Sequence, residues 1–258
     1  MSYKEIDFSK YSSIKIGGRV KTLVIDELMP IEKGVFIVGG ANNLLISPNP
    51  PPLAILSSRF DFIKEEGDVL RVGAGVGGGR LLSYAKKHDI AGFELLQKLP
   101  GKLGGIVKMN AGLKEFCISD NLLGIITEEG EKSRQDINFS YRNSDIKGVI
   151  YEVLFEKKSG FDEKKLAAFK EMRKNQPKEP SAGSCFKNPP NDYAGRLLEL
   201  AGFKGKREGN MAFSDVHANF LINLGGGTFE EAITLIKAAQ KAVFEHFGIE
   251  LELEIKIV

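Results

Sequence analysis

Residues 228–258 read TFEEAITLIKAAQKAVFEHFGIELELEIKIV and combine the two patterns that decide the fold. Thr228 and Glu231 have the spacing of a box that caps a helix N-terminus, and Gly248 is suited to end that helix. Between them, apolar residues at helical spacing predict one buried stripe, made of Ile233, Ile236, Ala239, Val243 and Phe247. From 249 to 258 apolar and polar residues alternate, which predicts a strand with one buried face.

Upstream of this stretch, strands, hairpins and helices follow one another without regular β-α-β alternation. Apolar and β-branched runs predict strands at 21–27, 34–40, 53–57, 69–75 and 149–157, and a strand hairpin at 122–137. Amphipathic runs predict helices at 79–93, 161–177 and 191–203. In the last of these, Asp192 is the expected cap and Gly202 lies just past the end. The mixture favours an α+β fold over a doubly wound sheet.

Two breaks in composition predict three segments. Pro48–Pro52 (PNPPP) lacks the N–H groups that a strand ladder needs, so a seam is expected there. At Ser159 and Gly160 the chain changes to a charged amphipathic run. We therefore expect subdomains at 1–52, 53–159 and 160–258.

Composition excludes several classes of protein. The 258 residues carry a formal net charge of +2 with no basic block, so nucleic acid is not an expected partner. Cys117 and Cys185 form no C-x-x-C pair, and His88, His217 and His246 lack metal-ligand spacing, so neither a disulfide framework nor a metal is expected. No run of 18 apolar residues and no leader-like N-terminus is present, which predicts a cytoplasmic protein without membrane insertion.

The stretch PSAGSCFKNP at 180–189 is the strongest candidate for chemistry. Ser184 offers a hydroxyl within a glycine-bearing loop, where small residues allow a close approach to the backbone. Lys187 and Asn188 add donors for an oxygen-rich anion. By composition alone, the stretch is also compatible with a plain polar loop before a helix.

Three glycine-rich stretches could cradle phosphates. Gly73–Gly78 fits G-x-G-x-x-G after a strand, yet Glu94, the one acidic candidate about 20 residues on, does not end a clear strand. Val38–Leu45 and Pro100–Gly112 offer backbone N–H groups, with side-chain amides from their asparagines. The second of these is expected to be a loop with one central apolar run. Plain turn chemistry is the alternative for all three.

A hydrolytic triad of Ser184, His217 and Asp215 is a weaker interpretation. The stretch AGSCF lacks the G-x-S-x-G elbow that exposes a nucleophile. A neutral, packed His217 and a small packed Cys185 are favoured instead.

Taken together in their order, these motifs resemble the UDP-N-acetylenolpyruvoylglucosamine reductase (MurB) family over nearly the whole chain. The matching stretches are SSIKIGG (12–18), VGGANNLLIS (38–47), LPGKLGGIVKMNAG (99–112), NFSYRNS (138–144), SAGSCFKNP (181–189), SDVHANFLINLGGGT (214–228) and GIELELEIKIV (248–258). The resemblance implies a two-part FAD-binding unit of the vanillyl-alcohol oxidase type and a C-terminal α+β domain that holds the substrate. The short run from Phe186 to His217 is similar to the shorter family type, which lacks an additional tyrosine-bearing loop.

The resemblance also implies roles for individual residues. Arg142 would be the catalytic arginine, Ser184 the proton donor and Glu254 the catalytic acid. The cofactor-binding residues would be Gly39, Gly40, Ala41, Asn42, Asn43, Leu44, Gly101, Lys102, Gly104, Gly105, Asn110 and Ala111. The substrate ligands would be Tyr141, Lys187 and Asn188. This chain departs from the family pattern at Lys102, where a small hydroxyl residue is usual, in GLKEF at 112–116, and in its shorter C-terminus.

The implied reaction belongs to peptidoglycan precursor synthesis. FAD, reduced by NADPH, would pass hydride to the enolpyruvyl group of UDP-N-acetylglucosamine enolpyruvate, giving UDP-N-acetylmuramate. Arg142 suits the stabilisation of the negative charge that develops, since its guanidinium stays protonated. A protonated Glu254 would assist, and Ser184 would give a proton to the strongly basic carbanion. The enzyme is expected to be a monomer.

Two other functions remain open from the residues alone. A nicotinamide-dependent Rossmann dehydrogenase would use Gly73–Gly78 and would be colourless, whereas a flavoprotein is yellow. A flavin- or nucleotide-binding protein without turnover would keep both of the other glycine loops and would tolerate the loss of Arg142 and Glu254.

Overall fold

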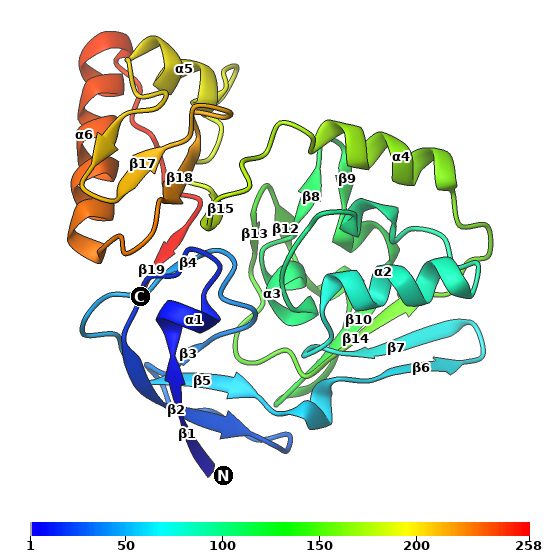
Figure 1. Ribbon diagram of the computed structural model, residues 1–258. Coiled ribbons are helices and arrows are strands. Elements are labelled where there is room, and N and C mark those ends of the chain that lie inside the picture. The colour runs from blue at the N-terminus through cyan, green and yellow to red at the C-terminus, as the bar shows by residue number, and fades with distance from the viewer. Residues whose placement is uncertain (1) are drawn as a thin grey trace. The chain divides into compact units, whose positions relative to one another are not determined.

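The computed structural model describes residues 2–258, which fold as a mixture of helices and short strands (Figure 1). The α-helices are α1 (Phe8–Tyr11), α2 (Gly78–Lys87), α3 (Leu103–Lys108), α4 (Glu163–Met172), α5 (Ala194–Leu200) and α6 (Phe229–Phe247). The 3-10 turns are η1 (Ser58–Phe60), η2 (Glu94–Leu96), η3 (Ile118–Asn121) and η4 (Arg134–Asp136). Helices and sheets share the same hydrophobic cores, so the predicted α+β class is confirmed.

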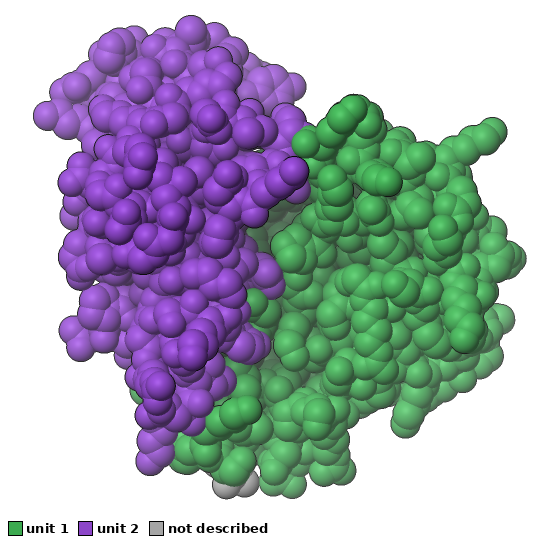
Figure 2. Space-filling model, viewed as in Figure 1, with its two compact units in different colours: residues 1–4, 22–40, 52–174 green, residues 5–21, 41–51, 175–258 purple. Residues whose placement is uncertain are grey.

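The chain divides into two compact units, each made of discontinuous segments (Figure 2). Unit 1 contains Thr22–Gly40, Pro52–Lys174 and the first residues up to Lys4. Unit 2 contains Glu5–Lys21, Ala41–Pro51 and Asn175–Val258. This division by packing differs from the three predicted segments, because residues 160–174 belong to unit 1. The functional subdivision into 1–52, 53–159 and 160–258 stays a prediction.

The main sheet of unit 1 is antiparallel. Its strands, in spatial order, are β11 (Gly130–Ser133), β10 (Leu122–Thr127), β14 (Glu152–Glu156), β7 (Val69–Gly73) and β6 (Ile63–Glu66). Leu81 and Ala85 of α2, with Leu103 and Val107 of α3, pack in one core with Phe155 of β14. On α2 the buried leucine is Leu81, since Leu82 is only partly buried.

The antiparallel sheet rules out the dinucleotide-binding interpretation of Gly73–Gly78. A Rossmann fingerprint follows a strand of a parallel sheet. Here β7 pairs antiparallel with both β14 and β6. Glycine is needed at 73 and 75 for packing, because an added Cβ would lie 2.1 Å and 2.9 Å from the carbonyl oxygen of Phe60.

A four-stranded sheet contains the N-terminal strands. Its order is β1 (Ser2–Asp7), β2 (Arg19–Ile25), β5 (Leu53–Leu56) and β3 (Phe36–Ile37), and β5 pairs parallel with β2 and β3. The chain thus crosses the predicted seam at Pro48–Pro52 and returns to the same sheet. Leu23, Ile25 and Ala54 pack with Tyr151 in a second core of unit 1.

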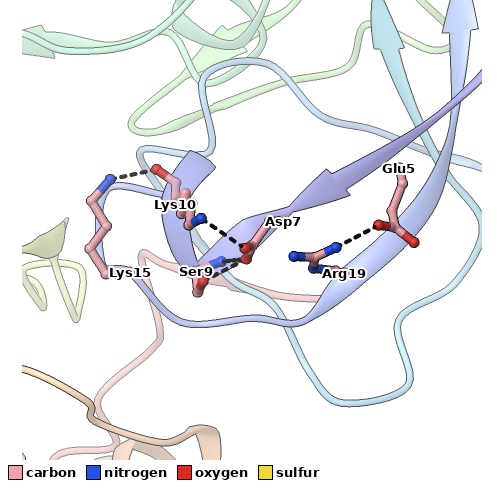
Figure 3. A network of polar contacts seen from close by, with 6 residues as sticks. All are labelled: Glu5, Asp7, Ser9, Lys10, Lys15 and Arg19. Atoms are coloured by element: carbon pink, nitrogen blue, oxygen red, sulfur yellow. Dashed lines mark hydrogen bonds and ion pairs between the residues drawn. The ribbon is translucent and has the colours of Figure 1, made fainter.

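Surface polar contacts tie together the first residues of unit 2 (Figure 3). Asp7 is the N-cap of α1, and its side chain accepts hydrogen bonds from the backbone N–H and the hydroxyl of Ser9. Arg19 pairs with Glu5 at 3.2 Å, and Lys15 donates to the carbonyl oxygen of Lys10 at 2.6 Å. Each of these pairs is exposed, so they define the local path of the chain more than its stability.

Unit 2 places two helices beside a small antiparallel sheet. The strand order is β15 (Ser181–Ser184), β18 (Phe220–Asn223), β17 (Met211–Phe213) and β16 (Arg207–Glu208). Helix α6 begins at the predicted Thr228–Glu231 capping box and ends at Gly248, whose φ is +67°. It buries Ala232, Leu235, Ile236, Ala239 and Val243, so the predicted stripe was displaced by one residue at its start, and Phe247 is 36% exposed rather than buried.

The C-terminal segment is extended but is not the continuous strand that its alternation predicted. Only Lys256–Ile257 forms a strand, β19, which pairs parallel with β4 (Leu44–Leu45). Before it, Leu253 makes an isolated bridge with Phe186. The segment changes partner along its length, and alternation shows which face is buried without showing which backbone pairs with it.

Candidate functional site

Ser184 lies at the end of β15, next to an irregularity in the strand. The pairing of β15 with β18 shifts register between Ser181 and Ser184, and Gly183 has a φ of +81°. A residue inserted into a strand pair bends the strand and re-aims the side chains beside it. Gly183 supplies the left-handed backbone without steric cost. The glycine of SAGSC therefore acts on the orientation of Ser184.

The residue after Ser184 holds Glu254. The carbonyl oxygen of Cys185 accepts the backbone N–H of Glu254 at 2.9 Å. Cys185 itself is fixed through its N–H to the carbonyl of Asn219 at 2.7 Å. Two predicted catalytic residues, far apart in sequence, are therefore joined within unit 2.

Asn43, from the first glycine loop, meets Glu254 as well. Its side-chain Nδ2 donates to the Glu254 carbonyl at 2.9 Å, and its own carbonyl accepts the N–H of Lys256 at 2.9 Å. Parallel pairing of β4 and β19 continues this contact. A predicted cofactor residue thus fixes the backbone of the predicted catalytic acid, whose side chain is half-buried.

Lys187 and Asn188 have partners of their own in the loop after Ser184. The Lys187 ammonium pairs with Glu252, and the Lys187 N–H donates to the Glu252 carbonyl at 2.8 Å. Asn188 Oδ1 accepts the N–H of Ala194 at 3.1 Å, at the start of α5. Asn188, rather than the predicted Asp192, therefore supplies the side-chain cap of α5, and Asp192 pairs with Arg196.

In unit 1, Arg142 lies at the tip of a hairpin between β12 (Phe139–Ser140) and β13 (Asn143–Ser144). Its φ is +54°, a conformation that costs a non-glycine residue about 1–2 kcal/mol. Nη2 donates to the carbonyl of Gly112 at 3.2 Å, and Cζ lies 5.0 Å from the centre of the Tyr141 ring. Arg142 and Tyr141 therefore form one half-exposed cationic surface.

Within unit 1, Gly39 of the first predicted cofactor loop lies beside the second predicted loop. A Cβ added at Gly39 would lie 3.8 Å from Cβ of Lys102 and 3.9 Å from Cα of Gly105. The third glycine stretch pairs with the second of these loops: Gly77 bridges Lys102, and the N–H of Gly78 donates to the Gly101 carbonyl at 2.9 Å. The predicted loop at 99–112 contains the short helix α3, and Lys102 is its N-terminal boundary residue.

Asn110 carries an unpaired oxygen. Its side chain is only 6% exposed, and its Nδ2 donates to the Ser140 carbonyl at 3.2 Å. Among residues 2–258, its Oδ1 is the buried side-chain atom left without a hydrogen-bond partner. Leaving such an oxygen unpaired costs about 1–3 kcal/mol. A bound molecule with an N–H or O–H donor would satisfy it.

The other predicted cofactor residues have these places. Ala41 has a φ of +49°, and its carbonyl accepts the N–H of Ser13 at 3.1 Å. Leu44 begins β4, and Asn42 and Gly40 stand before it in the same loop. The N–H of Gly104 donates to the Ala74 carbonyl, and the N–H of Ala111 to the Ile106 carbonyl, both at 2.9 Å.

The alternative chemistries find no support in the described residues. Burial raises the pKa of the Cys185 thiol, with a further contribution from the Glu254 charge, so this cysteine is a packed side chain. Burial lowers the pKa of His217, and its Nδ1 accepts the N–H of Asn219 at 3.2 Å, as a neutral imidazole does. Within residues 2–258 no cluster of three metal-ligating side chains occurs.

Sequence reasoning missed residues that position the site. The side chain of Asn219 makes two hydrogen bonds to the backbone of Phe186. Its Oδ1 accepts the Phe186 N–H at 2.9 Å, and its Nδ2 donates to the Phe186 carbonyl at 2.8 Å. Asn223 similarly donates to the Ile14 carbonyl at 2.9 Å. Neither residue has a local signal, because its partners are distant in sequence.

Comparison with known proteins places this chain in a class of α+β reductases. The crystal structure of UDP-N-acetylenolpyruvylglucosamine reductase (MurB) from Thermus caldophilus matches with a TM-score of 0.87 and 28% identity, over 100% of this chain and 99% of that one. A relative named UDP-N-acetylenolpyruvoylglucosamine reductase in Helicobacter hepaticus is 48% identical over 257 residues, 98% of each chain. One of the same name in Campylobacter jejuni is 47% identical. The sequence model of the family of UDP-N-acetylenolpyruvoylglucosamine reductase C-terminal domains matches residues 176–258.

The chain belongs to the UDP-N-acetylenolpyruvoylglucosamine reductase family. The predicted family and the predicted class, an oxidoreductase, are thereby confirmed. Within residues 2–258, no helix is both long enough and apolar enough to span a bilayer.

Proposed function

We propose that this protein is an FAD-dependent reductase that converts UDP-N-acetylglucosamine enolpyruvate to UDP-N-acetylmuramate, using NADPH. The observation that carries the proposal is the hydrogen bond from Glu254 to Cys185, which joins the segments of the proposed acid and the proposed proton donor. Family membership supports the substrate, since the relatives named above are reductases of this compound by name.

The residues of unit 1 fit FAD in two respects. A Cβ added at Gly77 or Gly105 would meet no atom within 4 Å, and neither residue has a positive φ, so neither packing nor backbone explains glycine there. Space kept open beside facing backbone suits a pyrophosphate-bearing ligand. The unpaired Oδ1 of Asn110 needs a donor, and the flavin ring and ribityl chain carry both N–H and O–H groups.

Residues 39–44 and 101–111 would hold the cofactor, with Asn110 as a hydrogen-bond acceptor. Bound FAD would supply the hydride chemistry of the reaction. Lys102 adds a cation at the position where the family usually has a small hydroxyl residue, and it stands beside Gly39. We propose that its ammonium interacts with the phosphates of the cofactor.

Three residues of the chain would act on the substrate. Arg142 would bind the enolpyruvyl carboxylate and stabilise the negative charge that develops on it. Glu254, in its neutral form, would assist this stabilisation. Ser184 would deliver its hydroxyl proton to the substrate carbon, and Tyr141, Lys187 and Asn188 would contact the UDP-sugar. The Asn188 side chain is compatible with this, because it meets the start of α5 through Oδ1, and its Nδ2 has no partner among residues 2–258.

The same proposal places the enzyme in peptidoglycan precursor synthesis in the cytoplasm, as a monomer of the shorter family type. Its reaction would supply the lactyl ether on which cell-wall growth and cell division depend.

The test combines a spectrum and an assay. The purified protein should absorb in the visible flavin bands, and NADPH oxidation should depend on added UDP-N-acetylglucosamine enolpyruvate. A colourless protein that binds no added FAD would refute the cofactor. A yellow protein that oxidises NADPH equally with and without the enolpyruvate would refute the substrate.

A further inference from the structure

Arg173 is a buried cation to which none of the roles proposed above is assigned. It follows α4 and is only 4% exposed. Its Nη1 donates to the carbonyl of Leu95 at 2.7 Å and also to that of Gln97. A charge removed from water is costly unless it is paired.

No carboxylate neutralises Arg173. Among residues 2–258, every hydrogen-bond acceptor of its guanidinium is a neutral backbone carbonyl, and no ion pair includes it. Glu94, the acid on the adjoining η2, directs its two oxygens to the N–H groups of Gly92 and Asp162, each at 2.8 Å. The positive charge of Arg173 therefore stays uncompensated inside unit 1.

This charge lies close to Arg142. Arg142 donates a hydrogen bond to the carbonyl of Gly112 in β8 (Gly112–Leu113), and β8 packs against η2. Arg173 donates to the carbonyl of Leu95 in the same η2 turn. Burial lowers the pKa of Arg173 to about 10, and the repulsion of the Arg142 charge contributes to the shift. Two like charges placed together in a partly dry region create a positive potential that suits an anion.

We propose that Arg173 is a positioning residue whose buried charge strengthens the binding of the substrate carboxylate at Arg142. The inference rests on the proposed function. The inference deepens the proposed function by assigning affinity for the substrate carboxylate to two arginines. Arg142 contacts the carboxylate, and Arg173 acts on it through its electrostatic field. The two arginines need not both touch the ligand, because Coulomb attraction in a region of low dielectric acts beyond contact distance.

Calorimetric titration of the purified FAD-loaded protein tests this with two ligands. UDP-N-acetylglucosamine enolpyruvate carries the carboxylate, and UDP-N-acetylglucosamine lacks it. Arg173→Met should weaken binding of the enolpyruvate by about tenfold. It should leave binding of UDP-N-acetylglucosamine unchanged, and it should flatten the dependence of enolpyruvate affinity on salt.

Three further variants separate charge from structure. Arg173→Lys keeps the charge and should retain most of the affinity. Arg173→Gln keeps an N–H donor for the carbonyls but loses the charge, so it should bind both ligands as Arg173→Met does. It also provides the measurement if Arg173→Met fails to fold. Arg134→Met is the matched control, since Arg134 also donates to two backbone carbonyls, those of Ser119 and Ile137, and should change neither affinity.

The opposing results are distinct. Wild-type affinity for the enolpyruvate in a folded Arg173→Gln protein would overturn the inference, as would an equal loss of both ligands. If the wild-type protein bound neither ligand, the proposed function itself would fail.

Discussion

At the scale of single residues, three predicted site residues have a left-handed backbone without being glycine. Ala41, Asn110 and Arg142 have φ values of +49°, +46° and +54°. Such conformations each cost about 1–3 kcal/mol and persist where surrounding structure enforces them. Asn110 adds an unpaired buried oxygen. Five other non-glycine residues in the described chain also have a positive φ, so the feature is not confined to the proposed site, but a local cost at ligand-binding residues is what a preorganised site would bear.

Ser184 should be required for one half of the reaction only. We expect Ser184→Ala to leave reduction of the protein by NADPH unchanged and to slow its reoxidation by the enolpyruvate about 100-fold or more, because a positioned proton donor is lost. Stopped-flow absorbance measures both steps. Ser181→Ala, at the other end of β15, is the control and should reoxidise normally. An unchanged Ser184→Ala rate would remove this hydroxyl from the mechanism.

His217 should make stability fall in mild acid. Burial lowers its pKa below the usual 6.5 and outweighs a backbone hydrogen bond that raises it, while the charges of Glu199 and Lys204 act in opposite directions. The unfolded chain therefore takes up a proton at a higher pH than the folded protein does. Stability should be full above the usual pKa and should decline as the pH falls from there to the lowered folded value.

Urea unfolding across this pH range measures the effect. His217→Gln should lose this part of the decline, whereas His246→Gln, at the exposed end of α6, should retain it. Equal pH profiles for wild type and His217→Gln would show that the histidine is not held neutral.

At the scale of elements, short irregular pieces carry the proposed chemistry while regular ones support them. The bulged end of β15 presents Ser184, the two-residue β12–β13 turn presents Arg142, and an extended segment presents Glu254. The long helix α6 and the five-stranded sheet provide the buried apolar faces. Bulges and turns can aim a side chain in directions that a regular strand or helix does not allow.

Gly183 should be needed for the geometry of the bulge. An added Cβ would meet nothing within 4 Å, so Gly183→Ala should destabilise through its φ of +81° alone, by about 1–2 kcal/mol. Activity should fall with it, since Ser184 is re-aimed. Gly18→Ala is the control: it also has open space but no positive φ, and it should be neutral or slightly stabilising. Thermal unfolding and the NADPH-oxidation assay distinguish the two variants, and equal effects would refute the assignment.

At the scale of the whole molecule, FAD should link cofactor affinity to stability. A ligand that binds only the folded protein stabilises it by about 2.7 kcal/mol at a hundred times its Kd. Gly105→Ala should leave the FAD-free protein as stable as wild type or stabilise it by up to about 1 kcal/mol, because the residue lies within α3. The same variant should gain less from added FAD, since the methyl group enters the proposed cradle. A full FAD-induced rise in Tm would contradict that placement.

Much of the molecule follows from local sequence patterns. The capping box of Thr228 and Glu231, the glycine that ends α6 and the strands of the main sheet other than β6 were predicted because neighbouring residues determine them. The family resemblance depended on motif order. It named Ser184, Glu254 and Asn43 as site residues, and the structure brings their three segments together through Cys185 and the Glu254 backbone. The short helix α3 was missed because two glycines mask its apolar spacing.

What the sequence alone determined is which segments are helical or extended and which face of each is apolar, because those properties depend on residues a few positions apart. Only the tertiary structure decided which extended segments pair. It assembled each unit from separate pieces of chain, turned the C-terminus from Cys185 to β4, gave the cap of α5 to Asn188, and buried Arg173 without an acid. Those choices come from contacts between residues far apart in the chain, and backbone hydrogen-bonding groups are the same in every residue but proline, so no local pattern specifies their partner.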